Sequence, residues 1–269
     1  MLKNIFEHIW LRLFAHRRLA RINHYRLSLA QKSLGINNYM SDAISGESYW
    51  CQLMLQQFKP SVIFDIGAHK GDYAKMFRQH GYAGKIYLFE PHPETFKVLS
   101  QHISADEATS LFNIGFSDTA GSHLLFDHAG DSGSPHATLF SSVITDLHGS
   151  EHASSVAVEL QTVDQFAAVN KIDRISLLKI DTEGNEYKIL LGASKLLREN
   201  RIDIIQFEFG EMNVASRIFF KDFYDLLSGQ YHLYRLLPND LLPLEPYNAR
   251  RHEIFIYQNI IAVNRKMYP

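Results

Sequence analysis

The stretch SVIFDIGAHKGDYAKMFRQHG, residues 61–81, decides the fold class of this chain. A short apolar run ends at Asp65, a turn with Gly67 and Gly71 follows, and a helical pattern then continues to Gly81. A strand that turns directly into a helix is the first half of a β-α-β unit, whose strands run parallel.

The same alternation continues beyond this stretch. Residues 84–93 are predicted as a strand ended by two prolines, 94–103 as a helix and 110–116 as a third strand. Continuous apolar strands that alternate with helices indicate a parallel sheet with both faces covered. We therefore predict a Rossmann-like α/β fold with helices on both faces of a mostly parallel sheet.

The remainder of the chain extends this pattern with one interruption. Further strands are predicted at 175–181, 202–209, 231–238 and 253–264, and helices at 163–170, 185–200 and 220–229. Two more predicted strands, within 121–160, flank the irregular stretch 127–154, which is rich in Gly, Ser, His and Asp. A loop of this length in a compact domain is usually functional or disordered. We predict an N-terminal helical extension at 1–59 and one domain at 60–269.

Composition excludes several classes of protein. The 269 residues are 46% hydrophobic, which allows a large core, and the net charge of −2 gives no overall attraction to nucleic acid. Cys51 is the single cysteine, so a disulfide framework is impossible within the chain. We expect a cytoplasmic protein, because arginines interrupt the first 30 residues and no apolar run is long enough to span a bilayer.

The charge is concentrated at the start of the chain. Residues 1–35 contain seven Lys or Arg and a single acid, a net of +6 in a chain whose total is −2. Apolar residues at spacings of three and four predict a helix over 2–33, broken at most once. Such a helix packs on the domain, packs on a second subunit, or lies peripherally on an anionic membrane, here the inner membrane surface.

The first turn of the predicted sheet is a candidate ligand site. In open α/β sheets, ligands bind beyond the carboxyl ends of the strands. This turn carries Asp65, Gly67, Ala68, His69 and Gly71. Its G-x-x-x-G spacing is not the dinucleotide fingerprint G-x-G-x-x-G, and its carboxylate disfavours a pyrophosphate. A ligand with positive charge and no phosphate suits the turn better.

The next two strands add groups that suit an adenosyl ligand. Glu90 closes the second strand, where an acid accepts hydrogen bonds from a ribose diol. Asn113 closes the third strand, where an adenine edge is expected. Together with the sulfonium and ammonium that Asp65 would attract, these features indicate S-adenosyl-L-methionine as cofactor.

Several of these stretches resemble one known family. VIFDIGAHKGDY, YLFEPHP, NIGFSDTAG, LKIDTEGNEYKILLGA and YQNIIAVNR are similar to the FkbM-type S-adenosylmethionine-dependent methyltransferases over roughly residues 60–265. The resemblance implies the seven-stranded class I methyltransferase sheet with its last strand antiparallel. It also implies that Asp65, Gly67, Glu90 and Asn113 fall on cofactor-binding positions.

Carboxylates gather where the fourth and fifth predicted strands end. Asp181 ends one strand, Glu183 follows it and is a candidate cap of the next helix, and Glu208 ends the other strand. A sugar hydroxyl needs a base or a metal to become a good nucleophile. Asp181, Glu183 and Glu208 are therefore candidate bases and candidate ligands of one divalent cation such as Mg²⁺. Asp181 is also a candidate cofactor-binding residue, because it is expected next to the methyl group. Lys179 is the expected partner of one of these acids.

The irregular stretch is rich in histidine. Any one of these residues is more often a surface histidine than a base, and their spacing does not indicate zinc. His136, within GSPHATLF, is the first candidate for a catalytic histidine that touches the acceptor.

These observations predict an O-methyltransferase that acts on a hydroxyl of a sugar, glycan, glycolipid or related small molecule. Nucleic acid is not expected as acceptor, since DTEGNE is not the proline-rich aromatic turn of amino-methylating DNA enzymes. A protein acceptor remains an alternative. A non-catalytic adenosyl-binding protein attached to a membrane is another, although acids retained at four strand ends argue against it.

Overall fold

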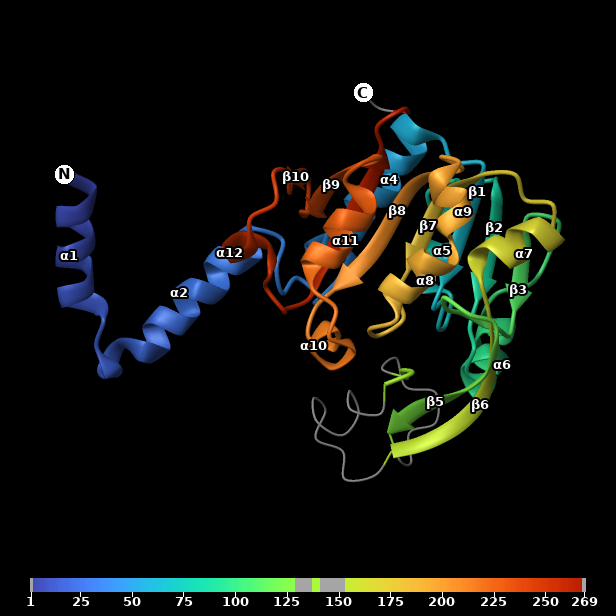
Figure 1. Cartoon of the computed structure of the whole chain (residues 1–269), viewed down its shortest axis with the longest axis horizontal. Helices are drawn as coiled ribbons and strands as arrows, with labels where there is room; N and C mark the ends of the chain where they lie inside the picture. Colours follow the sequence, from blue (N-terminus) through green and yellow to red (C-terminus); the bar gives the residue numbers. More distant parts are fainter. Residues whose placement is uncertain (1, 129–136, 141–152, 268–269) are drawn as a thin grey trace.

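A single mixed sheet forms the centre of the molecule (Figure 1). The structure is a computed structural model and describes residues 2–128, 137–140 and 153–267. The strand order is β10-β9-β11-β8-β7-β1-β2-β3, and β11 runs antiparallel to both of its neighbours. The strands are β1 (Val62–Ile66), β2 (Lys85–Phe89), β3 (Thr109–Phe112), β7 (Ile175–Ile180), β8 (Ile202–Phe209), β9 (Tyr231–Leu236), β10 (Leu241–Pro243) and β11 (Gln258–Asn264).

This order confirms the predicted class I methyltransferase fold. Seven strands form the expected mostly parallel sheet with the last strand antiparallel, and the short β10 adds an eighth at the edge beside β9. The order reverses between β1 and β7, which are parallel neighbours in the middle of the sheet. Ligand sites of open α/β sheets lie at such a switch point, beyond the carboxyl ends of the strands.

Helices cover both faces, and each face has its own apolar core. One face packs against α4 (Glu47–Leu53), α5 (Asp72–Gln79) and α6 (Pro93–His102). The other packs against α7 (Val163–Val169), α8 (Glu186–Gly192), α9 (Ser194–Arg198) and α11 (Phe220–Leu227). Side chains alternate between the faces, so Ile63 joins the first core and Phe64 the second. The helix predicted at 185–200 is two helices, because α8 ends at Gly192 before α9 begins.

The interruption at 121–160 forms a second, smaller sheet. Its order is β4-β6-β5, with β4 (Gly115–Phe116), β5 (Gly121–His128) and β6 (Ala153–Gln161). The two predicted strands of this region are therefore an antiparallel pair, and they extend past the carboxyl end of the main sheet (Figure 1). His136 lies outside the described residues, so its predicted catalytic role stays a prediction.

The N-terminal extension has two parts that behave differently. The first part, α1 (Leu2–Phe14), a short 3₁₀ turn (Arg17–Leu19) and α2 (Ala20–Ser33), projects away from the domain (Figure 1). The second part, α3 (Asp42–Ser45), α4 and the π-helical turn Met54–Phe58, packs on the sheet, and Trp50 and Met54 are fully buried there. The predicted boundary at residue 59 therefore falls within packed structure.

Two short helices complete the described structure, α10 (Met212–Ser216) and α12 (Ala249–His252). No helix among the described residues is long and apolar enough to cross a membrane.

The aromatic centre of the second core gives a test of the fold. Phe166 of α7 is 3% exposed, and its ring meets those of Phe89 and Phe116 edge-on at centroid distances of 4.9 and 5.7 Å. Phe166→Ala should lower the free energy of unfolding by about 3–5 kcal/mol, because it leaves a cavity between sheet and helix. Urea denaturation measures this loss. Val169→Ala on the same helix, where Val169 is 80% exposed, is the control and should change stability by no more than about 0.5 kcal/mol.

Candidate active site

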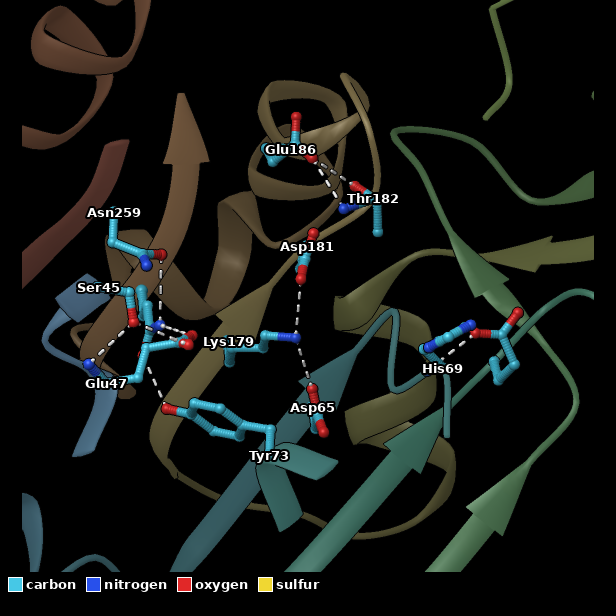
Figure 2. A network of polar contacts seen from close by, with 12 residues as sticks. Ser45, Glu47, Asp65, His69, Tyr73, Lys179, Asp181, Thr182, Glu186 and Asn259 are labelled. Atoms are coloured by element: carbon cyan, nitrogen blue, oxygen red, sulfur yellow. Dashed lines mark hydrogen bonds and ion pairs between the residues drawn. The ribbon is translucent and has the colours of Figure 1, made fainter. Parts of the chain in front are cut away.

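A row of polar side chains crosses the buried sheet beneath the candidate site (Figure 2). Asp65 of β1 is paired in register with Lys179 of β7, and Lys179 is paired with Gln206 of β8. Because register partners on parallel strands point to the same face, these three side chains lie together under α4 and α5. All three are at least 94% buried, so each needs a polar partner.

Lys179 is the centre of this row. Its Nζ lies 3.1 Å from a carboxylate oxygen of Asp65 and 3.3 Å from one of Asp181 (Figure 2). Burial by itself lowers the pKa of Lys179, but the charges of Asp65, Asp181 and Glu47, with the hydrogen bond to Asp65, together raise it by more. Lys179 therefore stays protonated and connects β1 with the end of β7. The prediction that it pairs with one acid understates its role.

The first turn brings the end of β1 against the turn after β7. Gly67 has a φ of +80°, and a Cβ at this position would meet the backbone oxygen of Asp181 at 1.7 Å. No other residue fits there. The amides of Gly67 and Ala68 both donate to the carbonyl of Phe89 at 3.0 Å, which joins the turn to the end of β2.

Glu90 connects the same turn to the second strand. Its carboxylate accepts one hydrogen bond from the amide of His69 at 3.0 Å and another from the amide of His92 at 2.8 Å. Burial raises the pKa of Glu90 to about 7 despite these two hydrogen bonds. The Asn113 side chain donates to the carbonyls of Glu90 and Pro91 at 2.8 and 2.9 Å, so Asn113 holds the backbone at this strand end.

A cavity of about 580 Å³ opens beyond these strand ends. It is lined by predicted site residues from four segments: Gly67, His69, Glu90, Asp181, Glu183 and Glu208. Leu125, Leu139 and Leu160, from the small sheet and the segment beside it, add apolar walls. Asp65, Gly71 and Asn113 line neither this cavity nor its neighbour among the described residues, and support the turn from behind.

A second cavity of about 170 Å³ adjoins the first across the Gly67 turn. Ala68, His69, Lys179 and Asp181 line it, together with Glu47 from the N-terminal extension. Glu47 accepts a hydrogen bond from Ser45 at 3.2 Å (Figure 2) and another from Gln206 at 3.4 Å. This cavity therefore offers both a carboxylate and an ammonium within a few side chains of the turn.

The carboxylates of the main cavity influence one another. Glu208 is half-buried in the cavity wall, and burial raises its pKa well above the usual range. The negative charges of Asp181 and Glu183 raise it further, while Lys179 lowers it. A carboxylate with a raised pKa is a better proton acceptor near neutral pH.

The turn after β7 differs from its prediction. Glu183 was the expected helix cap, but α8 begins only at Glu186, because Glu183 and Gly184 both have positive φ and continue the turn. The Glu186 carboxylate holds the turn instead, and it accepts hydrogen bonds from the amides of Thr182 at 2.9 Å and Gly184 at 3.2 Å. Glu183 thereby stays in the cavity wall.

The expected divalent cation finds no support in this arrangement. Among the described residues, no three His, Cys, Asp or Glu side chains come together as a metal site, and this includes Asp181, Glu183 and Glu208.

The small sheet is tied to this turn. Thr138 pairs with Phe126 of β5 as an isolated bridge, and its hydroxyl donates to the backbone oxygen of Glu183 at 2.8 Å. The wall of the main cavity is therefore attached to the turn that carries two of its acids.

The sequence model described as "Methyltransferase FkbM domain" matches residues 65–236 of the chain, which is more than half of its length. This chain belongs to the FkbM methyltransferase family. It is thus an S-adenosylmethionine-dependent methyltransferase, and the predicted family, fold and enzyme class are confirmed.

Two curated FkbM relatives are similar to the chain at low identity. The "2-O-methyltransferase NoeI" of Sinorhizobium fredii is 23% identical over 68% of this chain and 71% of its own length. The "Hexuronic acid methyltransferase AglP" of Haloferax volcanii is 22% identical over 62% of this chain and 64% of its own, a little under two thirds.

Among solved structures, an O-methyltransferase from Bacillus cereus in complex with SAH superposes at a TM-score of 0.45 with 11% identity. The superposition covers 98% of this chain and all of that one. This TM-score is too low to serve as further evidence for the fold, which the strand order of the sheet already identifies.

Sequence reasoning missed the residues that the extension contributes. Asn37 and Tyr39 line the main cavity, and Asp42 and Glu47 line the second one. All four precede the family match, which begins at residue 65. Glu47 does begin a helix that carries the buried Trp50, but the sequence does not reveal which face of the sheet that helix covers.

Glu186 gives a pH test of the turn. Burial raises the pKa of Glu186 to about 7, and the side chain is fully buried. A carboxyl with a higher pKa in the folded state stabilises the fold below its unfolded pKa, and that stability is lost as pH rises through the folded pKa. Glu186→Gln keeps an oxygen acceptor for the turn and cannot ionise. From about pH 5 to about pH 8, its free energy of unfolding should therefore fall less than that of the wild type, by about 2–3 kcal/mol.

Chemical denaturation at several pH values measures this difference. Glu90 titrates in both proteins, so subtraction isolates Glu186. Parallel pH dependences would show that Glu186 titrates normally.

Proposed function

We propose that the protein transfers a methyl group from S-adenosylmethionine to a hydroxyl of a sugar, glycan or related small molecule. The observation that carries this proposal is Glu208, a carboxylate with a raised pKa in the wall of a cavity that also contains the Gly67 turn. Both relatives support it, since one is named a 2-O-methyltransferase and the other a hexuronic acid methyltransferase.

The adenosyl part of the cofactor is proposed to lie in the main cavity, across the Gly67 turn. Glu90 lines this part and still has lone pairs for the ribose hydroxyls, because each carboxylate oxygen accepts only one hydrogen bond from the backbone. The amino-acid end is proposed to lie in the second cavity. Glu47 there suits the ammonium group and Lys179 the carboxylate.

The proton of the acceptor hydroxyl is proposed to go to Glu208. When bound, the cofactor supplies a methyl group on a positively charged sulfur. An alcohol becomes a good nucleophile only as its proton leaves, so a base within hydrogen-bond reach is needed. Glu208 has the strongest physical case, since burial and two neighbouring acids raise its pKa. Asp181 and Glu183 are proposed to orient the acceptor hydroxyls.

Removal of this base gives the first test. Glu208→Gln should lower kcat about 10²- to 10⁴-fold, while the dissociation constant for S-adenosylhomocysteine stays within about threefold. In the wild type, kcat should rise with pH through an apparent pKa above that of an ordinary glutamate, because only the ionised base accepts a proton. Glu199→Gln, on an exposed residue at the end of α9, is the control.

Isothermal titration calorimetry with S-adenosylhomocysteine tests the proposal as a whole. Absence of binding at millimolar ligand would sink it. If the ligand binds and Glu208→Gln retains full activity, the proposed methyl transfer stands but Glu208 is not the base.

We also propose that α1 and α2 contact an anionic membrane surface. All side chains from residue 4 to residue 13 are exposed, and Phe6, Trp10 and Leu13 are 62, 43 and 59% exposed. Arg26 lies over the ring of Trp10 at 5.7 Å, so cationic and apolar groups occur together. Helices with this composition bind the boundary between lipid headgroups and acyl chains.

Vesicle co-sedimentation tests this surface. Binding should occur with vesicles that contain phosphatidylglycerol, be absent with phosphatidylcholine alone, and weaken as salt rises from about 0.05 to about 0.5 M. The double variant Arg17→Gln/Arg18→Gln should bind less. The matched control Arg250→Gln/Arg251→Gln removes two exposed arginines on α12 and should bind as the wild type does. If residues 1–33 instead mediate dimerisation and no vesicle binding occurs, the partner of this surface is a second copy of the chain and not a membrane.

A further inference from the structure

Acidic side chains dominate the polar lining of the main cavity. Five acids line it, namely Glu90, Asp181, Glu183, Glu208 and Glu211. Its lining contains no lysine or arginine from the part of the chain that the structure describes. The stretches outside that part, 129–136 and 141–152, contain neither residue type in their sequence.

Two of the five acids have partners outside the cavity. Asp181 is paired with Lys179 at 3.3 Å, and Glu90 accepts hydrogen bonds from two backbone amides. Glu183, Glu208 and Glu211 line the cavity together with Met212 of α10 and Tyr257, which precedes β11. This is the part that the proposed cofactor position leaves to the acceptor.

Tyr39 and Tyr257 give this part its aromatic surface. Their rings meet edge-on at a centroid distance of 6.2 Å, and both residues line the cavity. The amide of Asn37 donates to the carbonyl of Tyr257 at 2.7 Å, which fixes the two segments to each other. Aromatic surface with a few acceptor oxygens suits a ligand that offers C–H faces and hydroxyl donors.

We propose that the acceptor has no anionic group near its reacting hydroxyl, so that it is a neutral sugar ring and not a uronic acid or a sugar phosphate. This inference rests on the proposed function and narrows its substrate class. A carboxylate or phosphate placed here would face like charges without a cationic partner, which is how binding sites reject a ligand. Neutral hydroxyls donate to the same carboxylates.

This selectivity separates the chain from one of its relatives. The relative named a hexuronic acid methyltransferase acts on an acceptor that carries a carboxylate. Recognition of a carboxylate normally uses Arg or Lys. Arg250 and Arg251 are exposed on α12 and do not line the cavity.

Matched acceptor pairs test the proposal directly. Methyl glucoside, galactoside and mannoside are compared with their uronic acids, which differ only by a carboxylate in place of CH₂OH. Methyl transfer from S-adenosylmethionine is followed for each. The neutral member should have at least about tenfold higher kcat/KM in any pair that reacts. Preference for a uronic acid would overturn the proposal.

Substitutions at Glu211 test whether the acids that line the main cavity cause the preference for neutral acceptors. Glu211→Gln and Glu211→Lys should narrow the ratio between neutral and anionic acceptors, more strongly for lysine. Glu199→Gln, remote from the cavity, should leave the ratio unchanged. An unchanged ratio in Glu211→Lys would show that the lining does not select on charge.

A second measurement needs no acceptor. Sinefungin carries an ammonium group on the carbon that replaces the methylated sulfur, whereas S-adenosylhomocysteine is neutral there. Sinefungin should bind at least about fivefold tighter, and Glu183→Gln should reduce this advantage. Equal affinities would overturn the charge argument even if no sugar of the panel reacts. Failure of both ligands to bind would instead reject the proposed function.

Discussion

The buried pairing of Lys179 with Asp65 and Asp181 is the constraint on which the site depends. An ammonium group inside a sheet is stable only with carboxylate partners, and loss of one partner from such a pair typically costs about 3–5 kcal/mol. Asp181 directly follows β7, and Asp65 lies in β1 just before the Gly67 turn, so a single charge connects the two central strands beside the cavity. The position of the carboxylates in the cavity follows from this connection.

Much of the arrangement could be predicted from the sequence because parallel strands end at the same edge. Gly67, Glu90, Asp181 and Glu208 are far apart in the chain, yet each follows or ends an apolar run. In a parallel sheet such positions must converge, and these four line one cavity. The physical rule acts on strand ends alone, so it holds without any knowledge of side-chain packing.

Other parts of the site depend on packing that no local pattern encodes. Asn113 is at a strand end as predicted, but its side-chain amide donates hydrogen bonds to the backbone carbonyls of Glu90 and Pro91. The Glu186 side chain, and not that of Glu183, accepts the hydrogen bonds that stabilise the turn after β7. Glu183 and Gly184 have positive φ angles, so the turn continues past them before α8 begins. Tyr39 and Glu47 line the cavities, and both come from the extension, whose α4 packs on the sheet. The family match begins at residue 65, so it leaves out residues of the extension that line the cavities.

The packing of α4 has a kinetic consequence through Cys51. This thiol is the single one in the chain, it is fully buried between α4 and the sheet, and burial raises its pKa to about 12. Only an exposed thiolate reacts quickly with alkylating agents. Reaction must then wait until the helix lifts from the sheet, so the alkylation rate reports how often this wall of the site opens. Alkylation of Cys51 therefore measures local opening at the place where the extension packs on the sheet.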